Sequence, residues 1–527
     1  MTPTPHDTTR ISSLSTDNPT PHLIPEGDNA TPLDYGSSAT DKLVLIIVGL
    51  PACGKTHVAQ RIVRYLNFFL DVPSEIFNAG DYRREMVGAQ VPASFYDPNN
   101  EKALRQLTEV RNAALEDMVQ FLKLDGVRVA VYDAPNATTD KREMISNRLK
   151  QERIGAKQIF LECICDDEEI LKKNIRKYLD SAPDYRDCDP DAAFKDFKER
   201  RERYMSDYET VHDEEGSYVK VYDCKRFVLN NIRGYLPLKI CHFVMNLHTL
   251  PRTFYLSRHG QSEYNVLGKI GGDSGLSKAG LEYARRLADY ARDVITVKTN
   301  TLANDYNGTT TEKEITNEDI PARLWTSTLR RTKETAQFIK HPSITHPGNK
   351  QTDDQDEVRD WVQLRPLPRR NLDELYAGTC DGMTYKEIEQ VYPEEFARRQ
   401  SDKLSYRYPR GESYMDVILR LEPLAHEMER TREPILMIGH QGILRILYAY
   451  FMGLSRDEAP YVSIPLNTVI KLEPHAYGCK EERICLMNKK EMLNDGQDEP
   501  VTSMPRLVVD KGENYAQDDP VMNAPSC

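Results

Sequence analysis

The segment from Gly49 to Thr56 reads GLPACGKT and has the G-x-x-x-x-G-K-[ST] spacing of a phosphate-binding loop. An apolar run at 43–48 precedes it and a helical pattern at 55–68 follows it, which is the strand–turn–helix context that such a loop requires. Backbone amides at the start of a helix bind phosphate oxygens well. The spacing therefore predicts nucleotide binding, and a strand–turn–helix without a ligand is the alternative.

Each residue of this predicted ATP and Mg²⁺ site has its own role. Gly49 and Gly54 let the backbone turn its amides toward the phosphates. Lys55 is expected to reach the β- and γ-phosphates, and Thr56 to hold Mg²⁺. Asp133 ends another apolar run, where its carboxylate would engage Mg²⁺ directly or through water. The alternative for Asp133 is that it only caps the helix that follows.

A second group of residues could transfer a phosphoryl group through histidine. Arg258 and His259 follow one predicted strand, while Arg331 and His440 follow two others. His259 is expected to attack phosphorus, and the two arginines to bind the equatorial oxygens. His440 would share the anionic charge, and Glu374 would protonate the leaving alkoxide, with no metal needed. A chance scatter of polar residues at strand ends is the alternative.

Alternating strands and helices must position these two groups. The pattern predicts an α/β fold with two doubly wound, mainly parallel sheets, because strands that alternate with helices pair in parallel and carry helices on both faces. The ligand edge of such a sheet lies beyond the carboxyl ends of its strands. The expected strands are 43–48, 127–132, 158–163, 253–256, 322–325 and 435–438, and the expected helices are 55–68, 277–293, 328–339 and 412–431.

Composition divides the chain into two ordered halves between two polar tails. Residues 1–40 and 489–527 are too polar to bury a core, so both tails are expected to be disordered. Two polar inserts, at about 296–318 and 341–360, are expected to be surface loops. The first expected half spans residues 41–245, and the second spans residues 251–485.

Charge and cysteine content exclude several classes of protein. The net charge of the 527 residues is -12, which argues against a protein that coats nucleic acid. No apolar run is long enough to cross a membrane, and no secretory signal is visible at the N-terminus. The 10 cysteines contain no Cys-x-x-Cys pair, so they are expected to be reduced thiols in a cytoplasmic protein.

The arrangement resembles the 6-phosphofructo-2-kinase/fructose-2,6-bisphosphatase family, in which a P-loop kinase half precedes a histidine phosphatase half. The resemblance covers about residues 42–485 and is far more specific than either short motif. It implies a cytosolic homodimer that makes fructose 2,6-bisphosphate from ATP and fructose 6-phosphate in one half and removes the 2-phosphate in the other. The stretches that carry it include FNAGDYRR at 77–84, YLSRHGQSEYNVLGKIGGDSGLS at 255–277, WTSTLRRTKETA at 325–336, YRYPRGESY at 406–414 and KLEPHAYGC at 471–479.

In the phosphatase half, the residues of this sequence match the family's pattern almost completely. Arg258, His259, Arg331, Glu374 and His440 fall on catalytic positions. The residues on positions that hold the sugar bisphosphate are Asn265, Tyr385, Arg399, Lys403, Tyr414, Gln441 and Arg445. The resemblance implies no cofactor in this half.

In the kinase half, the match is poorer. Four residues match sugar-phosphate contacts, namely Arg83, Arg84, Arg200 and Tyr204. Three others depart from the pattern: Pro135 stands where a threonine is expected, Leu107 where an arginine is expected, and Leu179 where a lysine is expected. Arg105, Arg111 and Lys177 are near but off register, and Cys53 replaces the usual polar residue of the loop.

These departures favour a fructose-2,6-bisphosphatase whose kinase half still binds ATP but is weak, because each lost bond to phosphate costs about 1.5–3 kcal/mol. A fully bifunctional enzyme is the first alternative. A nucleotide-sensing regulatory scaffold is the second, although the complete His/Arg/Glu set argues against it. A polynucleotide kinase-phosphatase is disfavoured by the net charge and by the lack of a basic, aromatic-rich groove.

Overall fold

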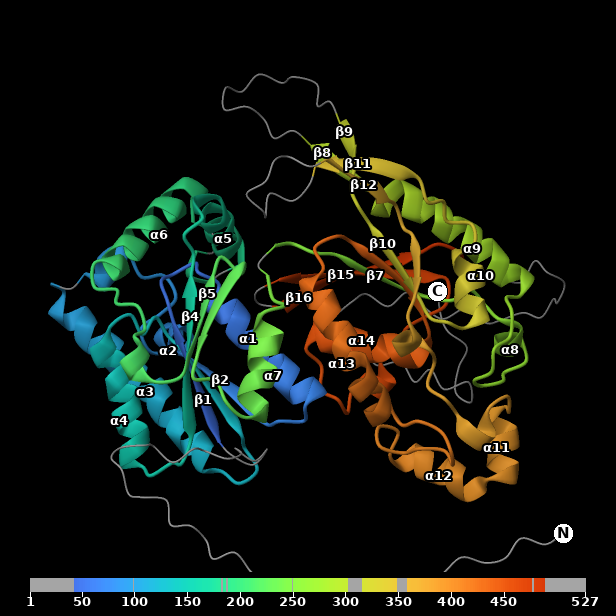
Figure 1. Cartoon of the computed structure of the whole chain (residues 1–527), viewed down its shortest axis with the longest axis horizontal. Helices are drawn as coiled ribbons and strands as arrows, with labels where there is room; N and C mark the ends of the chain where they lie inside the picture. The colour runs from blue at the N-terminus through green and yellow to red at the C-terminus, as the bar shows by residue number, and fades with distance from the viewer. Residues whose placement is uncertain are drawn as a thin grey trace, which may run out of the picture.

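The computed structural model describes residues 42–97, 99–181, 183–185, 188–248, 250–301, 315–347, 358–475 and 478–488. Two α/β bodies lie side by side, and each is built on its own six-stranded sheet (Figure 1). The expectation of two mainly parallel α/β domains is confirmed. The predicted disordered tails, 1–40 and 489–527, lie outside the described residues.

The first sheet has the order β2-β3-β1-β4-β5-β6, and only β6 is antiparallel to its neighbour. Its central strand β1 is fully buried, as expected for an apolar strand covered by helices on both faces. The strands are β1 Leu43–Val48, β2 Ser74–Asn78, β3 Val129–Asp133, β4 Lys157–Ile164, β5 Tyr218–Tyr222 and β6 Arg226–Asn230. The helices are α1 Lys55–Phe69, α2 Ala79–Met86, α3 Glu101–Lys123, α4 Thr139–Gln151, α5 Glu168–Ser181, α6 Pro190–Met205 and α7 Tyr235–Val244.

The second sheet has the order β13-β10-β14-β7-β15-β16, parallel through its first four strands and antiparallel in the last two. Its described strands are β7 Phe254–Arg258, β10 Arg323–Thr326, β13 Pro366–Pro368, β14 Ile435–Gly439, β15 Thr468–His475 and β16 Gly478–Cys485. The helices of this half are α8 Glu263–Val266, α9 Lys278–Tyr290, α10 Arg330–Ala336, α11 Tyr385–Val391, α12 Pro393–Ser401, α13 Tyr414–Arg430 and α14 Gln441–Met452. A π-helical turn, Ala291–Ile295, continues α9.

The two polar inserts are not loops throughout, so that expectation is wrong in part. The first contains the antiparallel pair β8 Val297–Thr301 and β9 Ile315–Asp319, and the second contains β11 Ser343–Pro347 and β12 Val358–Val362. Backbone hydrogen bonds in a hairpin do not require the apolar alternation that sequence patterns detect. Residues 302–314 and 348–357 lie outside the described part of the chain.

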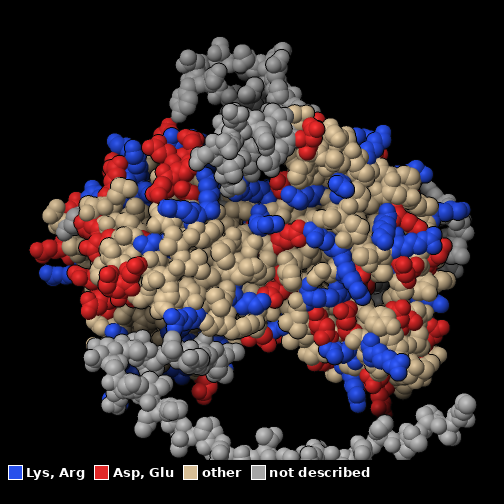
Figure 2. Space-filling view, in the orientation of Figure 1, with Lys and Arg blue, Asp and Glu red and all other residues tan. Residues whose placement is uncertain are grey.

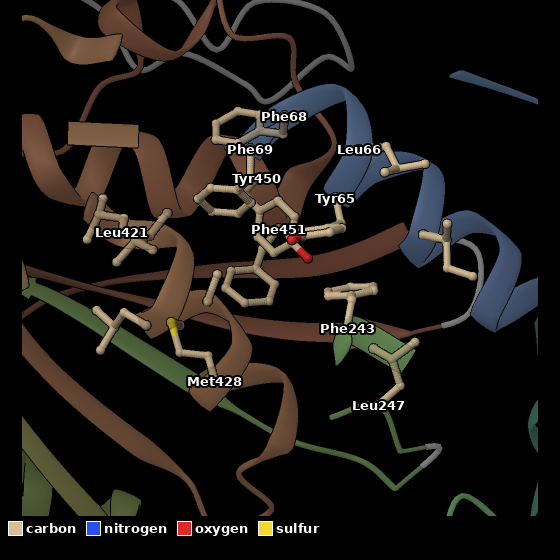
Figure 3. Packing of buried hydrophobic residues seen from close by; sticks show 14 of the residues in the cluster. Tyr65, Leu66, Phe68, Phe69, Phe243, Leu247, Leu421, Met428, Tyr450 and Phe451 are labelled. Carbon is tan, nitrogen blue, oxygen red and sulfur yellow. The ribbon is translucent and has the colours of Figure 1, made fainter. Parts of the chain in front are cut away.

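The two halves share one hydrophobic cluster, in which α1 and α7 of the first half pack against α13 and α14 of the second (Figures 1 and 3). The ring of Tyr65 on α1 stacks on that of Phe243 on α7, with centroids 4.3 Å apart. Phe69 meets Tyr450 of α14 with centroids 4.8 Å apart. Because α1 begins at Lys55 in the phosphate-binding loop, this packing connects the loop directly to the second half.

A buried ionic cluster lies in the same interface. Glu429 of α13 accepts a hydrogen bond from Arg61 of α1 at 2.8 Å and one from Tyr450 at 3.0 Å. Arg252, between the halves, pairs with the other carboxylate oxygen. Burial would raise the pKa of Glu429, but Arg252 and Arg61 outweigh it and lower that pKa to about 2. The carboxylate therefore stays charged and joins the two halves.

Within the described residues, no helix is long and apolar enough to span a bilayer. Basic and acidic side chains are interspersed over both halves on the face shown in Figure 2. A continuous basic surface, which a nucleic-acid partner would favour, is not present on that face.

Candidate active sites

The phosphate-binding loop connects β1 to α1 in a conformation that only glycine tolerates at its ends. Gly49 has φ 137° and Gly54 has φ 83°. A Cβ atom on Gly49 would lie 2.3 Å from the carbonyl oxygen of Cys163 on β4. Both glycines are therefore required by the backbone, and the helix amides that follow Gly54 face the space where phosphates would bind.

The expected Mg²⁺ ligands lie together at the carboxyl edge of the first sheet. The Asn78 amide donates to Asp133 at 2.6 Å and to the Thr56 hydroxyl at 3.4 Å. Burial raises the pKa of Asp133, although Lys55 and hydrogen bonds from Thr56 and Asn78 oppose that rise. A hydroxyl and a carboxylate beside a phosphate-binding loop are the oxygen ligands that Mg²⁺ prefers, so these residues fit the ion.

A cavity of about 750 Å³ extends from this loop over α2, α3, α5 and α6. At one end, the buried carboxylate of Asp184 binds Arg83 at 2.8 Å, Arg84 at 3.2 Å and Arg200 at 3.5 Å. Burial would raise the pKa of Asp184, but these arginines outweigh it and lower that pKa. Tyr204 also lines this end, so all four expected sugar-phosphate residues of this half share one cavity.

The departures from the family pattern fall on the same walls. Leu107 and Pro135 line the cavity where hydroxyl or cationic groups were expected. Leu179 instead packs with the cluster around Ile175 and Phe197. Arg111 and Lys177, which the sequence placed off register, both line the cavity.

In the second half, His259 and His440 lie at the ends of neighbouring strands, with ring centroids 5.2 Å apart. The Nδ1 atom of His259 lies 2.7 Å from the carbonyl oxygen of Gly260. Since a carbonyl can only accept, Nδ1 carries the proton and Nε2 keeps its lone pair. Burial, assisted by Arg331 and Arg258, lowers the pKa of His259 well below its ordinary value, so the imidazole is neutral.

The two arginines and the glutamate surround this pair. Arg331 donates from Nε to Nδ1 of His440 at 3.2 Å and from Nη1 to the carbonyl of Gly272 at 2.7 Å. Arg258 donates to the carbonyl of Ile464 at 3.0 Å. Burial lowers the pKa of Arg331, while the carboxylate of Glu374 raises it, so Glu374 lies within electrostatic reach. The structure brings all five expected catalytic residues to one place.

Four of the seven residues expected to hold the sugar bisphosphate form two hydrogen-bonded pairs. Arg399 donates to the Tyr385 hydroxyl at 2.9 Å. Arg445 donates to the Tyr414 hydroxyl at 3.3 Å. The remaining three are Gln441, which begins α14, Lys403, whose ammonium lies 5.0 Å from the ring of Tyr461, and Asn265, whose side chain accepts from Ser262 at 3.0 Å.

Sequence reasoning missed several supporting side chains. Arg420 of α13 donates to the carbonyls of Asn371 at 2.5 Å and Asp373 at 2.7 Å, which fixes the loop before Glu374. Ser327 lies 2.7 Å from Nε2 of His440. Arg420 had no spacing signal, whereas Ser327 is the one serine of the strand-end segment TSTLRRT at 326–332, which already supplied Arg331.

Two family models match the chain. The model described as 6-phosphofructo-2-kinase matches residues 34–251, and the model described as histidine phosphatase superfamily (branch 1) matches residues 254–300 and 355–486. The chain is also similar to an alpha-ribazole phosphatase structure from Shigella flexneri, with 18% identity, a TM-score of 0.33 and coverage of 44% of this chain and 96% of the other.

Curated relatives match both halves together. The rat protein named 6-phosphofructo-2-kinase/fructose-2,6-bisphosphatase 3 is 39% identical over 448 residues, covering 84% of this chain and 72% of its own. Rat isozyme 1 is 39% identical over 461 residues, and the protein from Aquarana catesbeiana is 37% identical over 463 residues; each match covers 87% of both chains. This chain, with its kinase domain and its histidine phosphatase domain, therefore belongs to the 6-phosphofructo-2-kinase/fructose-2,6-bisphosphatase family.

Proposed function

We propose that this chain is a bifunctional enzyme that hydrolyses fructose 2,6-bisphosphate in its second half and forms it from ATP and fructose 6-phosphate in its first. The convergence of His259, His440, Arg258, Arg331 and Glu374 carries the phosphatase part. The relatives' names, which pair both activities, favour bifunctionality over a phosphatase with a weak kinase half.

In the phosphatase half, Nε2 of His259 attacks phosphorus while the bond to the sugar oxygen breaks. Arg258 and Arg331 neutralise charge on the phosphoryl oxygens as it develops. Glu374 gives its proton to the departing sugar oxygen and then takes one from the water that hydrolyses the phosphohistidine. The hydrogen bond from Nδ1 to Gly260 holds the His259 ring and stabilises the cationic phosphohistidine.

In the kinase half, the ammonium of Lys55 donates to the Leu50 carbonyl at 2.7 Å within the loop, where it and the loop amides would bind the nucleotide phosphates, and Thr56 and Asp133 would hold Mg²⁺. When bound, Mg²⁺ neutralises charge on the transferring phosphoryl group. Arg83, Arg84 and Arg200, held by Asp184, orient the sugar phosphate at the far end of the cavity.

A phosphatase-dominant enzyme is the second candidate, and the apolar side chains of Leu107 and Pro135 in the cavity wall favour it. In both candidates the chain acts as a cytoplasmic homodimer. Sedimentation of the purified protein would test whether it is a dimer.

The deciding experiment pairs the two assays on wild type and His259→Ala. Wild type should release phosphate from fructose 2,6-bisphosphate and form a transient phosphoenzyme, and His259→Ala should do neither. ATP-dependent formation of fructose 2,6-bisphosphate should persist in His259→Ala. If no fructose 2,6-bisphosphate is formed, the phosphatase-dominant candidate is correct. Full phosphate release by His259→Ala would overturn the phosphohistidine mechanism. Absence of both activities in wild type would indicate a scaffold.

A further inference from the structure

The sugar end of the kinase cavity contains more cations than its carboxylates neutralise. Asp184 binds the three guanidinium groups of Arg83, Arg84 and Arg200, and Arg84 also pairs with Asp81. Farther along the same wall, Arg203 pairs with Asp97 at 2.5 Å. Four arginines paired with three carboxylates keep a net positive charge, which favours an anionic ligand.

Arg111 of α3 adds a cation to this wall without a carboxylate of its own. It lines the cavity, and its guanidinium donates only within its own helix, to the Leu107 carbonyl and the Thr108 hydroxyl, both at 3.2 Å. Among the described residues, no carboxylate lies at ion-pair distance from it. These two bonds hold the guanidinium against the helix and leave its remaining N–H groups without a protein acceptor.

Lys141 of α4 faces the same cavity beside Arg111. In the described part of the chain its backbone N–H donates to the Thr138 hydroxyl, while its ammonium group forms neither a hydrogen bond nor an ion pair. Burial and then the Arg111 guanidinium lower its pKa, while Asp207, Glu209 and Asp140 oppose this through space. Two adjacent cations that repel each other across a cavity are stabilised by an anion between them.

Arg111 lies one helical turn after Leu107, so it can supply a cation to the part of the cavity wall where Leu107 supplies none. Residues four apart lie on one helix face, and both Leu107 and Arg111 line the cavity. Arg111 also lies within electrostatic reach of Tyr204, whose pKa it lowers against the larger effect of burial. Tyr204 and Tyr96 therefore border a surface that suits a sugar ring carrying a phosphate group.

We infer that Arg111, with Lys141 beside it, binds the phosphate group of the sugar phosphate in the kinase half, in place of the arginine missing at position 107. The inference rests on the proposed kinase function and adds a residue that determines its substrate affinity. Arg111 and Lys141 would not distinguish one sugar phosphate from another, because the contacts to the sugar ring come from other residues.

The kinetic test compares Arg111→Gln with Arg105→Gln in a His259→Ala background, which removes the phosphatase reaction. Arg105 lies on the same helix but is largely exposed, 3.6 Å from Glu101. Arg111→Gln should raise the KM for fructose 6-phosphate about 10-fold to 100-fold, with the KM for ATP unchanged. Equal KM values for the two variants would overturn the inference.

Hydrogen–deuterium exchange with fructose 6-phosphate separates this inference from the kinase activity itself. Fructose 6-phosphate should protect peptides of α3 and α4 in wild type and Arg105→Gln but not in Arg111→Gln. Protection of α11 and α12 in the phosphatase half should be the same in all three proteins. If wild type shows α3 protection without turnover, the proposed kinase activity fails and the inference stands; if α3 is never protected, the inference fails.

Discussion

Ser327 Oγ lies 2.7 Å from Nε2 of His440, and the bond that Arg331 donates on the other side of the ring fixes which nitrogen carries the proton. The other nitrogen, Nδ1, accepts from Nε of Arg331, which always carries hydrogen. Burial, followed by Arg331, lowers the pKa of His440 well below its ordinary value, so the ring is neutral. Nε2–H therefore donates to Ser327, whose hydroxyl can donate to Thr332 at 2.8 Å.

Replacing Ser327 with Ala should lower the phosphatase kcat about 10-fold with a smaller effect on KM, because Nε2–H of His440 loses its acceptor and the ring loses its orientation. Steady-state phosphate release measures both constants. Ser455→Ala, an exposed serine after α14, is the matched control. An unchanged kcat in Ser327→Ala would show that His440 is positioned by Arg331 alone.

Gly49→Ala should abolish nucleotide binding, because the new Cβ would lie 2.3 Å from the Cys163 carbonyl and the loop would have to move. Titration with ATP by calorimetry measures the loss, and phosphate release by the second half should persist. Gly155→Ala is the control, since a Cβ there meets no atom within 4 Å. ATP binding of wild-type strength in Gly49→Ala would show that the loop does not bind nucleotide in this conformation.

Glu429→Gln should destabilise the protein by about 3–5 kcal/mol, because it leaves Arg61 and Arg252 buried without a counter-charge. The free energy of unfolding in urea at neutral pH measures this cost. Glu427→Gln, on the same helix, breaks only the partly exposed pair with Arg369 and should cost less than about 1 kcal/mol. Similar losses in both variants would mean that water reaches the Glu429 cluster.

Stability should fall as the pH drops from about 6.5 to 4. Burial, with Arg252, lowers the pKa of His248 to about 4, and His57, His259 and His440 are lowered well below their ordinary values. A histidine whose folded pKa is depressed stabilises the fold fully above its unfolded pKa, and this stability is lost as protons bind the unfolded chain.

For His248 alone, this loss should reach on the order of 3 kcal/mol by pH 4. Glu429 and Glu422, with pKa values of about 2, lose their contributions only below about pH 4.5, so the histidines dominate the earlier decline. Thermal unfolding across this pH range is the measurement. A Tm that is constant between pH 7.5 and 5.5 would contradict the assignment of neutral buried histidines.

The sequence predicted the central strands well, because β1, β3, β7, β10 and β14 are short apolar runs that end at, or just before, a glycine or a polar residue. The strands of the polar inserts and the β15–β16 hairpin were missed, since charged residues at positions such as Glu481 and Glu482 conceal any apolar alternation. The backbone hydrogen bonds that pair such strands do not require an alternating pattern of apolar side chains, so the sequence does not reveal them.

The candidate sites were predictable where a reactive side chain directly follows a predicted strand, as for His259 and His440. Supporting residues were not, because Arg420 reaches the Asn371 carbonyl from 49 positions along the chain and Ser327 reaches His440 across 113. Such contacts depend on how the helices and strands pack, which local spacing does not encode. The proposed role of Arg111 likewise rests on a tertiary observation, namely that Leu107 and Arg111 line the same cavity.

Helix α1 runs from the phosphate-binding loop to the aromatic cluster against α14, so the two halves cannot be separated without breaking that cluster. A chain cut between 245 and 251 would separate Phe68 and Phe69 on one fragment from Tyr450 on the other. Each fragment alone should aggregate, while the two fragments produced together in one cell should reassemble. The stability of each domain would then depend on the other, even where only one of their reactions is needed.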